Sequence, residues 1–238
     1  MTNKGIICST AILGFAGTVC YGYYRNWHPA VPKPDKGKKH IVCIGDSITF
    51  GAGVVPFQKW RSYPAYLQEL LGKEYQVMNF GLSGRTLLST GDMPYSKESH
   101  YAKAFQIENV HYLIMLGTND SKRYNWKEAQ YREELAALLL RCKSKGAVTV
   151  MKPPKAFPSK KTGEVLFDIQ DDVLCAIGRI IDETARELEI PVIDLYAFTE
   201  NHPEWFPDGV HPDAVCNQRI AEQICKTIME VGDVLYWH

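Results

Sequence analysis

Short apolar runs alternate with longer segments of helical periodicity along most of the chain. The apolar runs predict β-strands at residues 41–45, 76–79, 112–116, 147–151 and 191–194. Apolar residues at helical spacing predict helices around residues 63–71, 126–145, 169–188 and 212–231. This alternation is typical of a parallel sheet covered on both faces. The sequence therefore predicts a three-layer α/β/α fold with five parallel strands in a flavodoxin-like order.

Two of the predicted helices carry apolar faces, which we expect to pack on the sheet. Their members are Leu135, Leu138, Leu139 and Cys142 in one helix, and Val173, Ile177, Ile180 and Ile181 in the other. A Pro- and Lys-rich stretch at residues 152–163 follows the fourth strand. It predicts a long loop at the sheet edge where such proteins bind ligands.

The amino terminus differs from the rest of the chain. An uncharged, mostly apolar run at residues 5–24 lies between Lys4 and Arg25, and it predicts a signal peptide or membrane anchor at residues 1–24. A Pro- and Lys-rich stretch then predicts a linker at residues 25–39, before one folded domain at 40–238. Neither an A-x-A cleavage pattern nor a standard lipoprotein box is present, so cleavage, retention and lipidation of Cys20 all stay open.

The composition argues against some classes of function but does not identify one. Lysine plus arginine equals aspartate plus glutamate at 27 each, so no net charge attracts the chain to nucleic acid or to an anionic membrane. The seven cysteines show no C-x-x-C or Cys/His metal spacing, and we expect no structural metal. A small neutral or mildly polar substrate suits this balance.

Candidate catalytic residues follow the carboxyl ends of the predicted strands. Ser47 lies on the turn from the first strand to a helix, where its hydroxyl is exposed and backbone N–H groups can hold an oxyanion. The same position also suits a simple helix N-cap serine. Residues 79–86 (NFGLSGRT) after the second strand, and Asn119 after the third, offer further donors, although turn chemistry alone also explains them.

A second group of such residues precedes the last predicted helix. Asp208 stands three residues before His211, so its carboxylate can accept from the imidazole Nδ1–H and leave Nε2 as a general base. An isolated Asp/His pair is more often a surface coincidence. All four segments, however, fall at the strand ends where a single active site would need them.

Four segments of the chain, GDSITFGAG, NFGLSGRT, LGTND and DGVHP, resemble the four sequence blocks of the SGNH, or GDSL-like, hydrolases. The resemblance extends over roughly residues 40 to 230. It implies Ser47 as the nucleophile, His211 as the base and Asp208 as the group that orients the base. It also implies an oxyanion hole formed by the backbone of Ser47 and Gly84 and the side chain of Asn119. No cofactor is implied.

The sequence around these four segments is similar to that of bacterial family members that remove O-acetyl groups from carbohydrates. This similarity predicts an esterase that acts on a small-molecule or oligosaccharide ester. We expect the protein to be exported to the periplasm or the cell surface. A lysophospholipase or short-chain acylhydrolase is the alternative, and a non-catalytic sugar-binding protein is a third. A retained anchor followed by basic residues would instead favour a cytoplasmic domain. Aromatic residues in or near the predicted loops could stack on sugars or simply pack: Trp60, Tyr95, Tyr101, Tyr124, Trp126, Trp205 and Phe206.

Overall fold

The computed structural model describes residues 29–159 and 162–235. Five parallel strands form one sheet in the order β2-β1-β3-β4-β5. Their bounds are Lys39–Gly45 for β1, Tyr75–Gly81 for β2, Val110–Met115 for β3, Ala147–Lys152 for β4 and Val192–Asp194 for β5. The predicted three-layer α/β/α fold and its flavodoxin-like strand order are confirmed.

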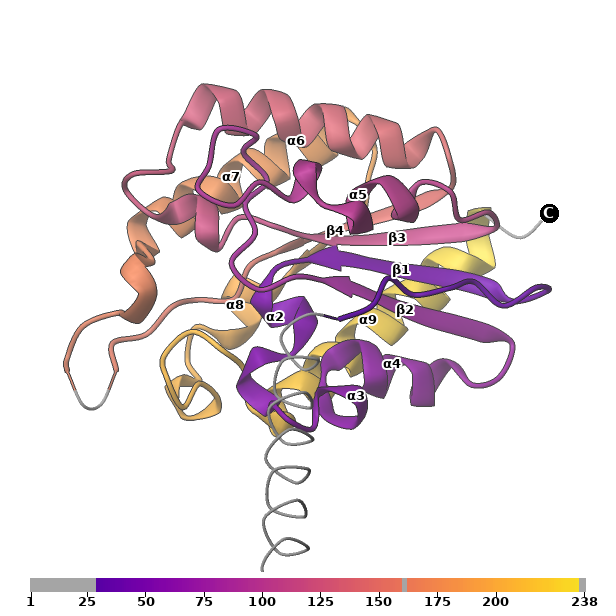
Figure 1. Cartoon of the computed structure of the whole chain (residues 1–238), viewed down its shortest axis with the longest axis horizontal. Helices are drawn as coiled ribbons and strands as arrows, with labels where there is room; N and C mark the ends of the chain where they lie inside the picture. The colour runs from indigo at the N-terminus through magenta and orange to yellow at the C-terminus, as the bar shows by residue number, and fades with distance from the viewer. Residues whose placement is uncertain (1–28, 160–161, 236–238) are drawn as a thin grey trace, which may run out of the picture. The chain divides into compact units, whose positions relative to one another are not determined.

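Helices cover both faces of this sheet (Figure 1). On one face lie α5 (Ser99–Ala104), α6 (Glu128–Lys143) and α7 (Asp171–Glu187), and on the other lie α3 (Gln58–Arg61), α4 (Tyr63–Leu71) and α9 (Ala214–Leu235). The short helices α2 (Ser47–Phe50) and α8 (Leu195–Thr199) directly follow β1 and β5. None of the helices in the described residues is long and apolar enough to cross a membrane; the predicted leader at 1–24 lies outside that range.

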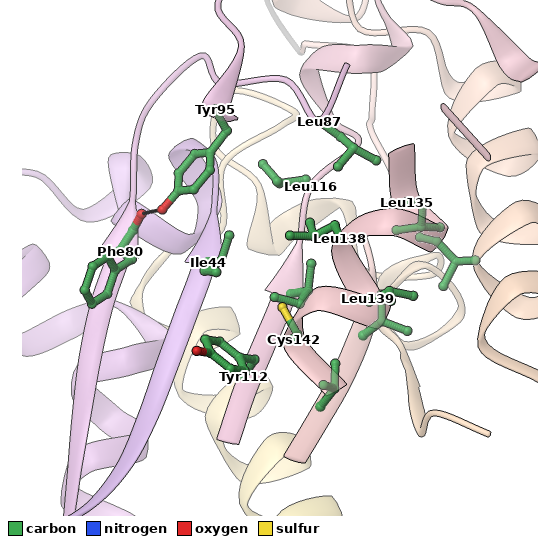
Figure 2. Close-up of a cluster of buried hydrophobic side chains, with 14 of the residues drawn as sticks. Ile44, Phe80, Leu87, Tyr95, Tyr112, Leu116, Leu135, Leu138, Leu139 and Cys142 are labelled. Carbon is green, nitrogen blue, oxygen red and sulfur yellow. Dashed lines mark hydrogen bonds between the residues drawn. The ribbon is translucent and has the colours of Figure 1, made fainter. Parts of the chain in front are cut away.

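The central strands are mostly apolar because both of their faces are covered. Side chains alternate, so Val42 and Ile44 of β1 join the cluster under α6 and α7, whereas Ile41 and Cys43 join the cluster under α4 and α9. Figure 2 shows part of the first cluster, in which buried residues of α6 meet Ile44 and its neighbours.

The predicted helix faces are confirmed where they meet the sheet. Leu135, Leu139 and Cys142 are buried in α6, and Ile177 and Ile181 are buried in α7. Val173 packs only partly against the same cluster. The sequence did not predict α5, because a six-residue helix has too few turns to show a periodic apolar face.

In the described residues 153–159 and 162–165, which follow β4, the chain forms neither helix nor strand, as predicted, and the short 3₁₀ turn η4 comes next at Leu166–Asp168. The segment after β4 is tied to the loop that carries the predicted histidine, because the Phe157 N–H donates to the Gly209 carbonyl over 2.8 Å. Phe157 also packs on Phe206, with ring centroids 5.3 Å apart. The loop after β4 thus contacts the loop that precedes α9.

Candidate active site

The turn after β1 presents Ser47 at the start of α2. Asp46 caps this helix by accepting from the Ile48 N–H over 2.9 Å. Gly45 allows the tight approach, since a Cβ there would lie 2.0 Å from the Thr49 hydroxyl and 2.7 Å from the Met115 carbonyl. The local sequence therefore fixes Ser47 at the carboxyl edge of the sheet, at the first residue of a short helix.

Three predicted residues meet in one hydrogen-bonded chain. The Nε2 atom of His211 lies 2.9 Å from the Ser47 Oγ, and its Nδ1 atom lies 2.7 Å from an Asp208 carboxylate oxygen. Burial raises the pKa of Asp208, but the hydrogen bond from His211, the charge of that imidazole and backbone N–H groups together hold the pKa at about 2. With Asp208 ionised, Nδ1 donates and Nε2 accepts from the serine hydroxyl.

The loop itself holds Asp208 in place. The Asp208 carboxylate accepts from the backbone N–H groups of Val210 and His211 over 2.9 and 2.7 Å. Gly209 has a positive φ of 84°, and a Cβ there would lie only 2.2 Å from the Phe157 carbonyl oxygen. Glycine is required here for conformation and for space, so the DGVH segment is shaped to orient its histidine.

The predicted oxyanion donors lie on two neighbouring loops. Gly84 sits in a turn with a positive φ of 83°. The Asn119 amide donates to the Arg85 carbonyl over 3.2 Å and lies 3.5 Å from the Asp46 carboxylate. Asn119 thereby bridges the residue after Gly84 and the residue before Ser47. The structure brings all three predicted donors to the same edge as His211.

Buried polar residues support these loops, and sequence reasoning missed them. Asn125 donates to the Asn119 carbonyl over 2.9 Å and to the Asp92 carboxylate over 2.8 Å. The fully buried Asp120 accepts from the backbone N–H groups of Leu87 and Leu88. Burial, with the charge of Asp46, raises the Asp120 pKa to about 7. The only sequence signal for Asp120 was its place beside Asn119 in LGTND.

The aromatic residues proposed for sugar contact divide into three groups. Tyr95 and Phe206 are buried, at 1% and 3% exposure, so a sugar platform is the wrong interpretation for them; the Tyr95 hydroxyl donates to the Phe80 carbonyl (Figure 2). Partly buried rings that pack on the core are Tyr101, Trp126 and Trp205. Trp60 and Tyr124 are exposed.

A different aromatic residue lies against the candidate base. The ring of Phe167 meets the His211 imidazole edge to face, with centroids 5.3 Å apart and planes at 66°. On the oxyanion side, Met93 lies so close to Gly84 that a Cβ on the glycine would sit 3.0 Å from the Met93 sulfur. Both side chains are substantially exposed, and no local sequence pattern pointed to either.

In chemical terms the arrangement suits acyl transfer. A serine hydroxyl, a base that can take its proton and a carboxylate that orients the base are in contact, and hydrogen-bond donors for an oxyanion lie beside them. Across residues 29–159 and 162–235, no group of three or more His, Cys, Asp or Glu side chains is arranged to hold a metal ion.

Comparisons with known proteins extend this picture. An acetylxylan esterase from Xylanibacter ruminicola is 32% identical over 257 residues, which cover 96% of this chain and 53% of that protein. The chain therefore spans about half the length of this relative.

Solved structures share the fold at lower identity. A carbohydrate acetylesterase from Sinorhizobium meliloti has a TM-score of 0.64 and 19% identity, covering 82% of this chain and 100% of that chain. A lipase/acylhydrolase from Enterococcus faecalis has a TM-score of 0.62 and 24% identity, covering 81% and 96%. The family model for GDSL-like lipases and acylhydrolases matches residues 43–219. This chain therefore belongs to the GDSL-like lipase/acylhydrolase family.

Proposed function

We propose that the protein is a serine esterase that removes O-acetyl groups from carbohydrates. The observation that carries the proposal is the continuous chain from Ser47 through His211 to Asp208, with contacts of 2.9 and 2.7 Å. The similarity to an acetylxylan esterase supports the choice of substrate class. No residue of the proposed catalytic set, which also includes Gly84 and Asn119, is replaced.

The proposed reaction has two acyl-transfer steps. Ser47 Oγ attacks the acetyl carbonyl carbon while His211 Nε2 takes the hydroxyl proton, and the carbonyl oxygen becomes an oxyanion facing Gly84 and Asn119. The C–O bond to the sugar then breaks, and His211 returns the proton to the departing sugar oxygen. Water, deprotonated by His211, next attacks the carbonyl carbon of the acetyl-serine. The bond from that carbon to Ser47 Oγ breaks, His211 returns the proton to Oγ, and acetate leaves.

Lipid esters are the alternative substrate class. The fold is shared with a lipase/acylhydrolase, and the name of the family includes lipases. A non-catalytic sugar-binding protein is disfavoured because the serine, base and orienting carboxylate are all retained in hydrogen-bonding geometry.

The test is acetate release from acetylated xylo-oligosaccharides by the purified full chain and by Ser47→Ala. Nitrophenyl esters from acetyl to octanoyl are measured in parallel. We expect acetate from the oligosaccharide, with a rate that vanishes in Ser47→Ala. Turnover only of nitrophenyl esters, rising with chain length, would replace the sugar with a lipid substrate. No turnover of any ester would leave the binding protein as the better account.

We further propose that residues 1–24 direct export, so that the domain at 40–238 acts in the periplasm or at the cell surface. The uncharged run between Lys4 and Arg25 supports this assignment. Fractionation of cells that produce the full chain tests it. We expect the domain outside the cytoplasm; a domain accessible only from the cytoplasm would instead identify the segment as an inward-orienting anchor.

A further inference from the structure

Phe167 is an exposed aromatic residue beside the proposed catalytic base. Its side chain keeps 53% of its surface accessible even though its ring contacts the His211 imidazole. A single exposed apolar side chain is common on protein surfaces, but Phe167 is both exposed and in contact with the proposed base. The part of the Phe167 ring that does not touch His211 is therefore accessible to a bound molecule.

The backbone conformation at Phe167 is energetically unfavourable. Phe167 and Asp168 have positive φ values of 63° and 58°, a conformation that glycine or asparagine adopts more easily than a bulky residue. Backbone outliers of this kind persist when the surroundings impose them, and they concentrate at binding and catalytic sites. Burial of the Phe167 ring does not offset the cost, because about half of the side chain stays exposed.

Neighbouring contacts impose this conformation. Ile169, two residues on, is buried at 3% exposure and anchors the segment in the core. The next residue, Gln170, donates its backbone N–H to the Ser121 hydroxyl over 3.2 Å, and Ser121 belongs to the same 3₁₀ turn as Asn119. The turn that presents Phe167 is thus attached to the structure that presents the proposed oxyanion donor.

The proposed reaction fixes which part of a substrate would lie near this ring. His211 Nε2 must come within hydrogen-bond reach of the departing alcohol oxygen to return its proton. The Nδ1 side of the imidazole is occupied by Asp208. The group attached to the departing oxygen therefore lies beside the imidazole, and a sugar ring there is within contact distance of an aromatic ring centred 5.3 Å away.

We propose that Phe167 is the aromatic platform on which the sugar of the substrate stacks, so that it determines specificity for the alcohol side of the ester. This inference rests on the proposed function and names the residue that recognises the carbohydrate. A sugar ring presents weakly positive C–H groups on one face, which suit the negative face of an aromatic ring. The carbonyl oxygen of the ester lies on the other side, toward the proposed oxyanion donors Gly84 and Asn119.

The test compares two acetyl esters that differ only in the alcohol. Wild type, Phe167→Ala and Phe167→Tyr are assayed with an acetylated xylo-oligosaccharide and with vinyl acetate, which has no sugar. A nitrophenyl octanoate assay reports on the acyl side. Leu140→Ala is the matched control: Leu140 is also about half exposed, but it lies in the last turn of α6, at the opposite edge of the sheet. Melting temperatures establish that each variant is folded.

We expect Phe167→Ala to raise KM for the oligosaccharide by about 3- to 10-fold, with kcat nearly unchanged and vinyl acetate turnover nearly unchanged. Phe167→Tyr should restore the wild-type KM, and Leu140→Ala should match wild type. An equal fall in kcat on both esters would overturn the inference, because it would mean that Phe167 only positions His211.

Other outcomes separate this inference from the proposed function. If Phe167→Ala does not affect oligosaccharide turnover, Phe167 is not the sugar platform, but the proposed esterase function is unaffected. A larger loss on octanoyl esters than on the oligosaccharide assigns Phe167 to the acyl side and also overturns it. If wild type itself releases no acetate from the oligosaccharide, the proposed function fails, and the platform fails with it.

Discussion

Replacement of Asn119 by alanine tests the oxyanion hole most sharply. Asn119 is 6% exposed, and its amide donates to the Arg85 carbonyl over 3.2 Å. Because an amide nitrogen carries two hydrogens, one can hold this carbonyl while the other faces the oxyanion. Loss of one such donor typically lowers kcat by about 10²- to 10³-fold, or about 2.7 to 4 kcal/mol of transition-state stabilisation.

The same substitution should have a smaller effect on stability. It removes one hydrogen bond of normal length, which is worth about 0.5 to 1.5 kcal/mol net, and leaves the Arg85 carbonyl without that donor. The contact with Asp46, at 3.5 Å, is too long to add much. We therefore expect a modest loss of folding free energy beside a large loss of rate.

Asn125→Ala is the matched control. Asn125 is also buried, and its side chain makes three hydrogen bonds. It donates to the Asn119 carbonyl and to the Asp92 carboxylate, and it accepts from the Asp92 backbone N–H. It offers nothing to the oxyanion directly, so its loss should reduce stability more than Asn119→Ala and kcat/KM less.

The assay is kcat/KM on an acetyl ester, converted to ΔΔG‡, together with the free energy of unfolding in urea. Asn119 is not an oxyanion donor if folded Asn119→Ala retains more than about a tenth of wild-type kcat/KM, or if Asn125→Ala loses more rate than Asn119→Ala does.

Three further predictions concern the base, a buried histidine and a glycine. Asp208→Asn should lower kcat/KM less than Ser47→Ala, on a scale of about 10⁴-fold against 10⁶-fold, because a misoriented histidine retains partial function; equal losses from folded variants would contradict this order. Burial lowers the pKa of His111 in the folded protein to about 4, whereas its pKa in the unfolded chain is about 6.5. As the pH falls below about 6.5, the unfolded chain therefore takes up a proton that the folded protein does not, and the folded protein loses stability. Urea titrations should therefore show wild type losing about 2 kcal/mol more than His111→Gln between pH 7.5 and 5, and parallel losses would contradict the argument. Gly209→Ala should lower both stability and kcat/KM because its Cβ would strike the Phe157 carbonyl, whereas Gly37→Ala, with a similar φ and open space around it, should affect only stability.

Much of the architecture could be predicted from the sequence because it depends on local patterns. Each strand is a short apolar run, and α6 and α7 show their buried faces by spacing alone. The proposed catalytic residues could be named because they follow strand ends, and parallel strands bring those ends to one edge. Asp208 and His211 lie on one loop, so even their contact followed from spacing.

The remaining features depend on tertiary contacts that no local pattern records. The sequence places Tyr95 in or near a predicted loop, but in the structure its ring is buried and its hydroxyl donates to the Phe80 carbonyl. Phe167 is far from His211 in sequence, and its positive φ is opposite to the preference of its residue type. Asn125 supports Asn119 only because the chain turns back on itself after β3.

The central claim is that Ser47 is the nucleophile of an esterase that acts on acetylated sugars. Its most direct test is titration of the full chain with a serine-reactive phosphonate, with peptide mapping of the label and acetate release from acetylated xylo-oligosaccharide followed on the same samples. We predict one phosphonate per chain on Ser47, loss of acetate release in proportion to labelling, and no labelling of Ser47→Ala. Acetate release that persists in fully labelled protein, or a label on another residue, would contradict this claim.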